Sequence, residues 1–200
     1  MRRVLKYIFL VLLVIVVDQA VKLWVHGHME LGLAGHINLV GNLFGLTYVL
    51  NYGMAFGLQW SFKYGKLLMT GIRLAISLGI VRHIFFGFLR SAPTGWVVGW
   101  VLILAGALGN SIDGVLYGVY LDNAPDTAVM KWFHGQTIDM LHLDVWSGTL
   151  PNWFPIVGGE VIALLPIFNI ADVSICSGLL CILYCYRQIA AWEKSIRSIS

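Results

Sequence analysis

The sequence predicts an all-α membrane protein with four transmembrane helices and a small β-rich platform on the outer face of the membrane. Of 200 residues, 58% are hydrophobic and 12% are charged, whereas soluble domains carry about 45–50% apolar and about 25% charged residues. Four apolar stretches are also long enough to cross a hydrocarbon core, which takes roughly 20 helical residues. The length suits one integral membrane domain over residues 1–200, and a net charge of +3 is too small to indicate a nucleic-acid partner.

The predicted spans lie near residues 4–26, 66–89, 96–121 and 161–187. Met1-Arg2-Arg3 before the first span is typical of the start of a secretory signal peptide, but no small-residue cleavage site follows it. We therefore expect the first span to be retained.

Lysines and arginines beside the spans predict the orientation of the bundle, because cytoplasmic flanks are enriched in positive charge. They precede the first span, flank the turn between the second and third, and follow the fourth. Both chain ends are therefore expected in the cytoplasm, with the connections 27–65 and 122–160 on the outer side. The residues concerned are Arg2, Arg3, Lys6, Arg82, Arg90, Arg187, Lys194 and Arg197.

The two outer connections carry different signals. Residues 36–52 alternate partly between apolar and polar side chains, and Gly41-Asn42 is a turn signal. This pattern predicts a short β-structure lying on the membrane surface. The connection 122–160 is rich in tryptophan and proline, which is typical of a segment at the headgroup level.

Charged side chains inside predicted spans are costly, so each is a candidate for a functional role. Under the predicted topology five of them converge on one layer beneath the outer surface: Asp18, Lys22, Arg73, Asp113 and Asp172. Asp18 and Lys22 are four residues apart and can pair on one helix face. A buried ion network explains the first four charges better than catalysis does. Asp172 is left for a catalytic role, because the nearby cations already have carboxylates.

A pair of aspartates that share one proton can hydrolyse a peptide bond without a metal ion. The ionised carboxylate takes a proton from water while its protonated partner donates to the scissile carbonyl oxygen, and the two like charges push the pKa values of the pair apart. Asp172 is one candidate. Spacing does not choose its partner among Asp113, Asp122, Asp126, Asp139 and Asp144.

Two other functions compete with proteolysis at this point. The polar cluster could form the relay of a small transporter or proton conductor, although four spans are few for a transporter and no inverted repeat is visible. It could also hold together the helices of a structural membrane adaptor. A metal site has little support, because the cysteines and histidines lack ligand spacing.

Four sequence elements resemble motifs of the lipoprotein signal peptidase family, in the family's order. Residues 18–22 read DQAVK, which is similar to D-Q-x-x-K, and residues 51–57 read NYGMAFG, which is similar to N-x-G-x-A-F-G. Residues 106–113 read GALGNSID, which is similar to G-A-x-G-N-x-x-D. Residues 168–172 read FNIAD, which is similar to F-N-x-A-D.

The resemblance implies a four-helix protease of the bacterial inner membrane, with its active site toward the outer face. It implies an aspartic endopeptidase that removes signal peptides from diacylglyceryl-modified prolipoproteins just before the lipidated cysteine. Its partners would be this lipid-modified substrate and membrane lipid, with no metal or organic cofactor. The last residue of F-N-x-A-D is catalytic in the family, and here that position is Asp172.

The second catalytic aspartate of the family lies in a G-x-V-x-D element, for which two segments qualify. Residues 118–122 (GVYLD) end at Asp122, and residues 135–139 (GQTID) end at Asp139. Longer family members carry an insertion before an element that resembles the later segment, so the resemblance implies Asp139, with Asp122 as the fallback. The family's usual arginine after Asp113 is replaced by Gly114, and Arg73 is a candidate substitute.

The remaining motif residues are expected to support the catalytic pair. Asn51 and Asn169 could hold the aspartates or the substrate backbone by hydrogen bonds. Asn110 could hydrogen-bond across helices, as polar residues in membranes do. Gly53 permits a close backbone approach.

Overall fold

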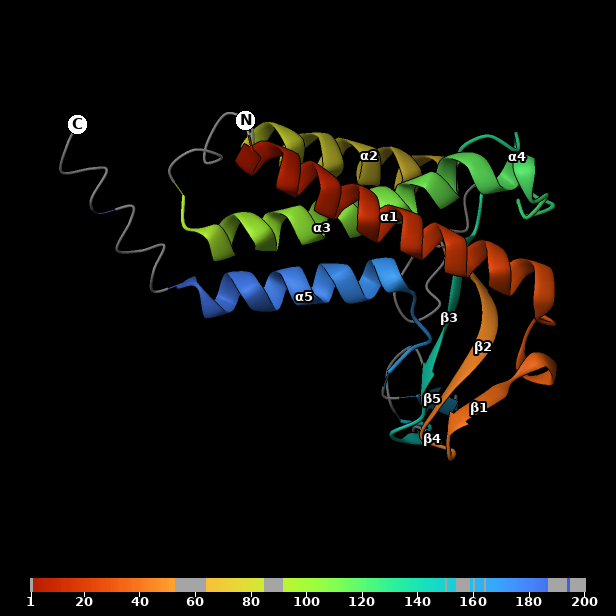
Figure 1. Cartoon of the computed structure of the whole chain (residues 1–200). Helices are drawn as coiled ribbons and strands as arrows, with labels where there is room; N and C mark the ends of the chain where they lie inside the picture. The colour runs from red at the N-terminus through yellow and green to blue at the C-terminus, as the bar shows by residue number, and fades with distance from the viewer. Residues whose placement is uncertain are drawn as a thin grey trace.

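The computed structural model describes residues 2–52, 64–84, 92–149, 151–153, 159, 161–163, 165–186 and 194. In these ranges four long helices lie side by side, and a small antiparallel sheet projects from one end of them (Figure 1). The start of the first helix and the end of the last lie at the opposite end. The four helices are α1 (Arg2–His28), α2 (Gly65–His83), α3 (Thr94–Ile112) and α5 (Ile170–Tyr184).

Helix α3 continues beyond its last α-helical residue. A π-helical turn (η4, Asp113–Tyr117) and the short α4 (Gly118–Tyr120) extend it into one apolar helix of 27 residues. Single π-helical turns inside α-helices occur frequently at functional sites. This turn begins at Asp113, one of the five charges predicted to converge beneath the outer surface.

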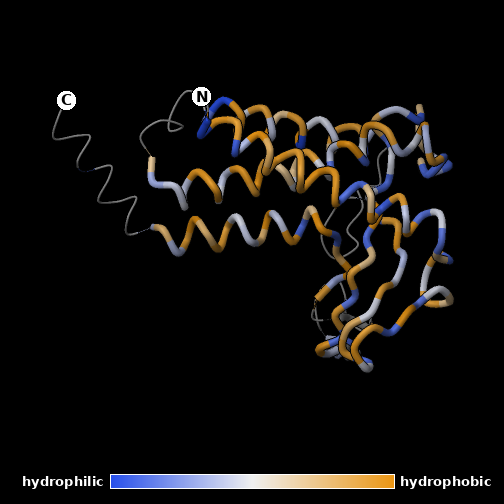
Figure 2. The backbone as a smooth tube through the Cα atoms, viewed as in Figure 1, coloured by the Kyte–Doolittle hydropathy of each residue, from blue (hydrophilic) through white to orange (hydrophobic). Residues whose placement is uncertain are grey.

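The helices expose a large hydrophobic surface, whose contact with water would be unfavourable. On α1, Phe9 and Val16 are 67% and 62% exposed, and hydrophobic residues cover most of the length of the helices (Figure 2). An apolar face of this extent is stable when lipid covers it. Within the described residues, α1 and the helix Thr94–Tyr120 are long and apolar enough to cross a membrane, whereas α5 is apolar but shorter. The four-span topology therefore stays a prediction.

The predicted start of the fourth span at residue 161 is wrong. Val161–Ala163 forms strand β5, and α5 begins only at Ile170. Pro166 disfavours helix in the residue before it, and Asn169 then caps the helix. The Asn169 side chain accepts a hydrogen bond from the Asp172 backbone N–H, while the Asp172 carboxylate accepts one from the Asn169 N–H.

The main sheet has three antiparallel strands in the order β1-β2-β3. Strands β1 (Ile37–Val40) and β2 (Phe44–Asn51) confirm the β-structure predicted for residues 36–52. Strand β3 (Thr137–Leu143) comes from the connection 122–160, for which no strand was predicted. β4 (Ser147–Thr149) pairs with β5 in a separate two-stranded sheet.

Strand β3 links the sheet to the start of α5. The backbone N–H groups of Met140 and Leu141 donate to the Phe168 carbonyl oxygen at 3.1 and 2.7 Å. Ile138 and Met140 on one face of β3 pack with Val25 of α1 in a hydrophobic core. Because successive side chains of a strand point to opposite faces, Thr137 and Asp139 project together on the other face.

Helices α3 and α5 pack closely because small residues line their contact, as is usual between helices in lipid. A Cβ atom at Gly99 would lie 2.6 Å from Ile182 Cγ1 and 2.9 Å from the Gly178 carbonyl oxygen. A Cβ atom at Gly106 would overlap the Ala171 carbonyl oxygen and lie 2.7 Å from Ile175 Cγ1. The first turn of α5, which carries Asp172, is thus held against α3.

We expect Gly106→Val to lower the thermal unfolding temperature of the purified protein. The added side chain must push α5 away from α3, and overpacking of this kind typically costs about 1–3 kcal/mol. Gly79→Val is the matched control, because a Cβ atom at Gly79 in α2 meets no heavy atom within 4 Å. Equal unfolding temperatures for the two variants would contradict the close α3–α5 contact.

Candidate active site

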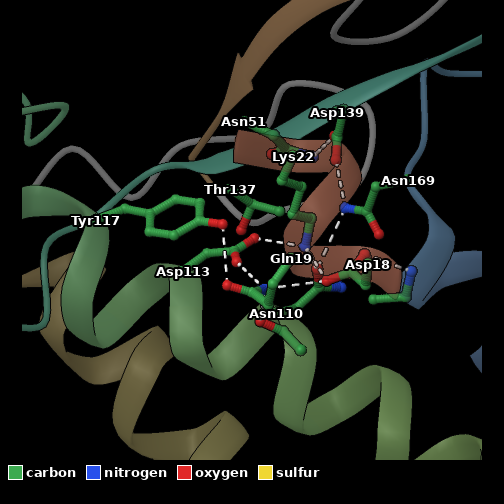
Figure 3. Close-up of polar contacts among 12 residues, drawn as sticks. Asp18, Gln19, Lys22, Asn51, Asn110, Asp113, Tyr117, Thr137, Asp139 and Asn169 are labelled. Carbon is green, nitrogen blue, oxygen red and sulfur yellow. Dashed lines mark hydrogen bonds and ion pairs between the residues drawn. The ribbon is translucent and has the colours of Figure 1, made fainter. Parts of the chain in front are cut away.

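A buried network of polar side chains lies where the helices meet the sheet (Figure 3). Its members come from five parts of the chain that are far apart in the sequence: α1, β2, α3 with its π-helical turn, β3 and the start of α5. Asp18, Lys22, Asp113 and Asn169 are 0% exposed, and Asp139 is 2% exposed. Buried polar groups are stable only when they are paired or hydrogen-bonded, and here each one has such partners.

Lys22 is the positive centre of this network. Its Nζ atom lies 2.8 Å from Asp18 Oδ2 and 2.6 Å from Asp113 Oδ2, and it donates to Asn110 Oδ1 at 3.0 Å. The three contacts satisfy all three donors of the ammonium group. The i,i+4 pair predicted for Asp18 and Lys22 is therefore confirmed, and α1 is tied to α3 through the same charge.

Hydrogen bonds from neutral side chains surround these charges. Gln19 Nε2 donates to Asp113 Oδ1 at 2.9 Å and to Asp18 Oδ2 at 3.1 Å. Gln19 Oε1 in turn accepts from the Tyr117 hydroxyl at 2.9 Å. Each carboxylate oxygen of Asp113 thus has a donor, which is what makes a buried carboxylate tolerable.

Asp18 also holds the start of α5. Its Oδ1 atom accepts a hydrogen bond from the Ala171 backbone N–H at 2.9 Å. The first N–H groups of a helix lack partners within the helix and carry a partial positive charge. A carboxylate from α1 therefore fixes the helix turn that bears Asp172.

Asn110 and Asn169 connect this ion network to Asp172 and Asp139. Asn110 Nδ2 donates to Asp172 Oδ1 at 2.9 Å, and Asn110 Oδ1 accepts from Asn169 Nδ2 at 3.2 Å. Asn169 Nδ2 also donates to Asp139 Oδ1 at 2.6 Å, and the Asn169 backbone N–H donates to Asp172 Oδ2 at 3.1 Å. A single asparagine therefore touches both aspartates.

Asp139 is buried between two amide donors. Asn51 Nδ2 donates to its Oδ2 atom at 2.8 Å, opposite the hydrogen bond from Asn169. Burial raises the pKa of Asp139 from 3.8 to about 7, although the hydrogen bonds from Asn51 and Asn169 act in the other direction. The charge of Asp172 adds to the increase, because a second negative charge disfavours ionisation. Asp139 is thus poised to exchange a proton near neutral pH.

The predicted site residues other than Arg73 divide into three groups in the structure. The network contains Asp18, Lys22, Asn51, Asn110, Asp113, Asp139, Asn169 and Asp172. Asp122 lies apart on the surface, where its side chain is 77% exposed and pairs with Lys131 at 2.6 Å. Gly53 lies outside the described residues.

Arg73 approaches the network from α2. Its Nη1 atom lies 3.4 Å from Thr137 Oγ1, and its charge interacts with those of Asp172, Asp113 and Asp139. Gly114 has no room for a long side chain, because a Cβ atom there would lie 2.9 Å from Thr70 Oγ1 of α2. Helix α2 thus lies close to Gly114, and the same helix supplies the positive charge of Arg73.

Sequence reasoning missed three network residues: Gln19, Tyr117 and Thr137. Gln19 stands inside the D-Q-x-x-K element, and Tyr117 follows Asp113 by four residues, so helical spacing could have placed it beside that aspartate. Thr137 is two residues before Asp139, which puts it on the same face once residues 137–143 are known to form a strand. The alternation of polar and apolar side chains in residues 137–140 (TIDM) is a short local signal of that strand.

The described residues hold no cluster of three or more His, Cys, Asp or Glu side chains suited to a metal ion. Fold and site together define a helical membrane protein in which two carboxylates from separate elements share one asparagine. The sequence matches the family described as "Signal peptidase (SPase) II" over residues 10–187. The chain therefore belongs to the signal peptidase II family and is a protease.

Individual relatives agree with this assignment. The chain is 47% identical to a lipoprotein signal peptidase of Amoebophilus asiaticus, over 88% of this chain and 75% of that protein. It is 32% identical to one of Porphyromonas gingivalis, over 90% of this chain and 81% of that protein. A solved bacterial membrane enzyme has a TM-score of 0.63 at 23% identity, covering 92% of this chain and 88% of that one, which shows a common fold.

We expect Lys22→Met to destabilise the protein strongly. The substitution leaves the Asp18 and Asp113 carboxylates buried without their cation, and breaking a buried pair in this way costs about 3–5 kcal/mol. Lys131→Met is the control, since the Lys131–Asp122 pair has the same 2.6 Å separation but side chains that are 61% and 77% exposed. Exposed pairs contribute about 0–1 kcal/mol. Thermal unfolding should separate the two variants, and equal losses would contradict the central role of Lys22.

Proposed function

We propose that this protein cleaves diacylglyceryl-modified prolipoproteins just before the lipidated cysteine, with Asp139 and Asp172 as a catalytic pair that activates water. The observation that carries the proposal is the position of Asn169. Its side chain donates to Asp139 and its backbone N–H donates to Asp172, so both carboxyl groups are hydrogen-bonded to the same residue. The names of the relatives support the substrate class.

The two aspartates are suited to different roles. Asp139 is the proton donor to the scissile carbonyl oxygen, because burial raises its pKa to about 7 and keeps a large protonated fraction near neutral pH. Asp172 is the base that takes a proton from the attacking water. It is less buried than Asp139 and accepts hydrogen bonds from Asn110 and Asn169. When the tetrahedral intermediate collapses, Asp172 donates the proton it took from water to the leaving amine nitrogen as the C–N bond breaks. Asp139 takes a proton back from the hydroxyl group on the former carbonyl carbon, so both carboxyl groups return to their starting state.

The remaining members of the network hold this pair in place. Asn51, Asn110 and Asn169 orient the carboxyl groups through their amides. Asp18 positions the first turn of α5, and Lys22 ties Asp18 to Asp113. Such preorganisation matters because small misplacements of catalytic groups are costly in rate.

We also propose that the chain crosses the inner membrane four times, with both ends in the cytoplasm and the network near the outer face. Positive residues at the start of α1 and at residue 82 of α2 support this orientation. Both lie at the end of the helical layer away from the sheet. Membership in a protease family does not favour a transporter or a proton relay.

We expect Asp139→Asn and Asp172→Asn each to reduce turnover of a lipidated prolipoprotein by about 10,000-fold or more. An amide cannot exchange the proton that the pair must pass, while the variants keep the shape of the site. Cleavage of purified lipidated precursor, followed by mass spectrometry, measures the loss, and thermal unfolding checks that each variant is folded.

Asp122→Asn is the control for this experiment. Asp122 is exposed and has a positive φ of 53°, a conformation that asparagine adopts readily, so activity should stay near that of the unmodified protein. Full turnover by Asp172→Asn would contradict the mechanism. Activity in Asp139→Asn together with loss in Asp122→Asn would assign the second catalytic aspartate to residue 122.

The proposal also predicts the pH dependence of kcat/KM. Because the pKa of Asp139 is about 7, kcat/KM should be constant on the acid side of this limb and fall about tenfold per pH unit above it, as the donor loses its proton. Asn51→Ala removes a donor that favours the ionised form, so the limb should move to higher pH. Asn42→Ala, in the exposed turn between β1 and β2, should leave the limb in place. A limb that moves to lower pH in Asn51→Ala would contradict the assignment of Asp139 as proton donor.

A further inference from the structure

Helix α2 presents two different faces. On one face, Thr70 donates a hydrogen bond to the Phe133 carbonyl oxygen, and Arg73 donates to Thr137 Oγ1 in the polar network. The neighbouring face carries an apolar groove of about 520 Å³, which we call the α2 groove. Its lining residues recur at helical spacing along α2 and are joined by one residue of the loop before β3: Tyr64, Leu67, Leu68, Gly71, Leu74 and Phe133.

The wall formed by Phe133 is held in an unfavourable backbone conformation. Phe133 has a φ of 63°, which is rare for a bulky residue other than glycine. Its backbone N–H donates to the Val115 carbonyl oxygen at 3.2 Å, and its carbonyl oxygen accepts from the Thr70 hydroxyl at 2.9 Å. Strain that is held from both sides is typical of functional segments. Here the two hydrogen bonds fix an aromatic side chain over α2.

The α2 groove lies next to residues of α2 that contact the candidate active site. Thr70, which fixes Phe133, also packs against Gly114 beside Asp113. Arg73 is adjacent to the groove residue Leu74 and reaches Thr137, whose side chain lies on the same face of β3 as Asp139. The groove and the residues that reach the network of the proposed catalytic aspartates therefore lie on neighbouring faces of α2.

We propose that the α2 groove binds one acyl chain of the diacylglyceryl group on the substrate cysteine, an inference that rests on the proposed function. The lining is apolar throughout, apart from the tyrosine hydroxyl, and the volume lies in the range of about 300–1,000 Å³ that holds small ligands. A chain attached to the residue after the scissile bond must begin beside the catalytic pair, and the groove lies on the helix from which Arg73 reaches Thr137 in this network.

Shape rather than hydrophobicity would drive this binding. The competing environment for an acyl chain is the bilayer, which is as apolar as the groove, so the gain comes from van der Waals contact with fixed walls. The groove would therefore act by orienting the lipidated cysteine. Its loss should appear mainly in KM, and mainly for substrates whose chains are long enough to fill it.

Gly71→Leu tests the proposal because it fills the groove without disturbing the helix. A Cβ atom at Gly71 meets no heavy atom within 4 Å, and leucine is a better helix former than glycine. Gly79→Leu is the matched control, since Gly79 is also a helical glycine of α2 with open space at its Cβ position but does not line the groove. Both variants should fold as well as the unmodified protein.

The measurement is KM and kcat for two synthetic lipopeptides that differ only in their acyl chains, dipalmitoyl in one and dihexanoyl in the other. Gly71→Leu should raise KM for the dipalmitoyl substrate by about fivefold, change kcat little, and leave KM for the dihexanoyl substrate unchanged. Gly79→Leu should match the unmodified protein on both substrates.

Three results would overturn or redirect the conclusion. Equal KM values for Gly71→Leu and the unmodified protein on the dipalmitoyl substrate would overturn the acyl-chain site. So would an equal rise in KM for the dihexanoyl substrate, because the effect would then not depend on a chain long enough to fill the groove. Failure of the unmodified protein to cleave either lipopeptide would instead overturn the proposed function, so the two failures are distinguishable.

Discussion

The burial of one ammonium group between two carboxylates is the constraint on which the rest of the structure depends. Lys22 and Asp18 lie on α1, and Asp113 begins the π-helical turn that follows α3. None of the three side chains reaches solvent, so each must keep its partners or bear a large desolvation cost. The depth and rotation of α1 against α3 are therefore set by charge rather than by apolar packing, which is less specific in lipid.

From this pair the constraint spreads to the start of α5 and to the sheet. Asp18 accepts the hydrogen bond from Ala171 N–H, and Asn110 bonds with both Lys22 and Asp172. Asn169 then reaches Asp139 on β3. Each link joins elements that are distant in the sequence, so a change at Lys22 should alter the positions of Asp139 and Asp172, although Lys22 hydrogen-bonds with neither. Structural and catalytic roles cannot be separated cleanly in such a network.

Much of this arrangement could be predicted from local sequence patterns. Apolar length identified the helices, because a hydrocarbon core demands about 20 helical residues, and the i,i+4 spacing of Asp18 and Lys22 identified their pair. The alternation and the turn signal in residues 36–52 identified β1 and β2. The start of α5 was placed too early, because apolarity in residues 161–163 did not distinguish a strand from a helix. Pro166 and the Asn169–Asp172 capping box mark the true beginning.

The sequence by itself determined the membrane class, the order of the motifs and the charges that had to be buried together, because composition and helical periodicity act over a few turns. Only the tertiary structure decided which aspartate joins Asn169. Asp122 and Asp139 end similar pentapeptides, yet Asp122 is exposed beside Lys131, whereas Asp139 is buried opposite Val49. Strand register and the approach of residue 168 to β3 separate them. Such pairings depend on contacts between segments far apart in the chain, which no local pattern encodes.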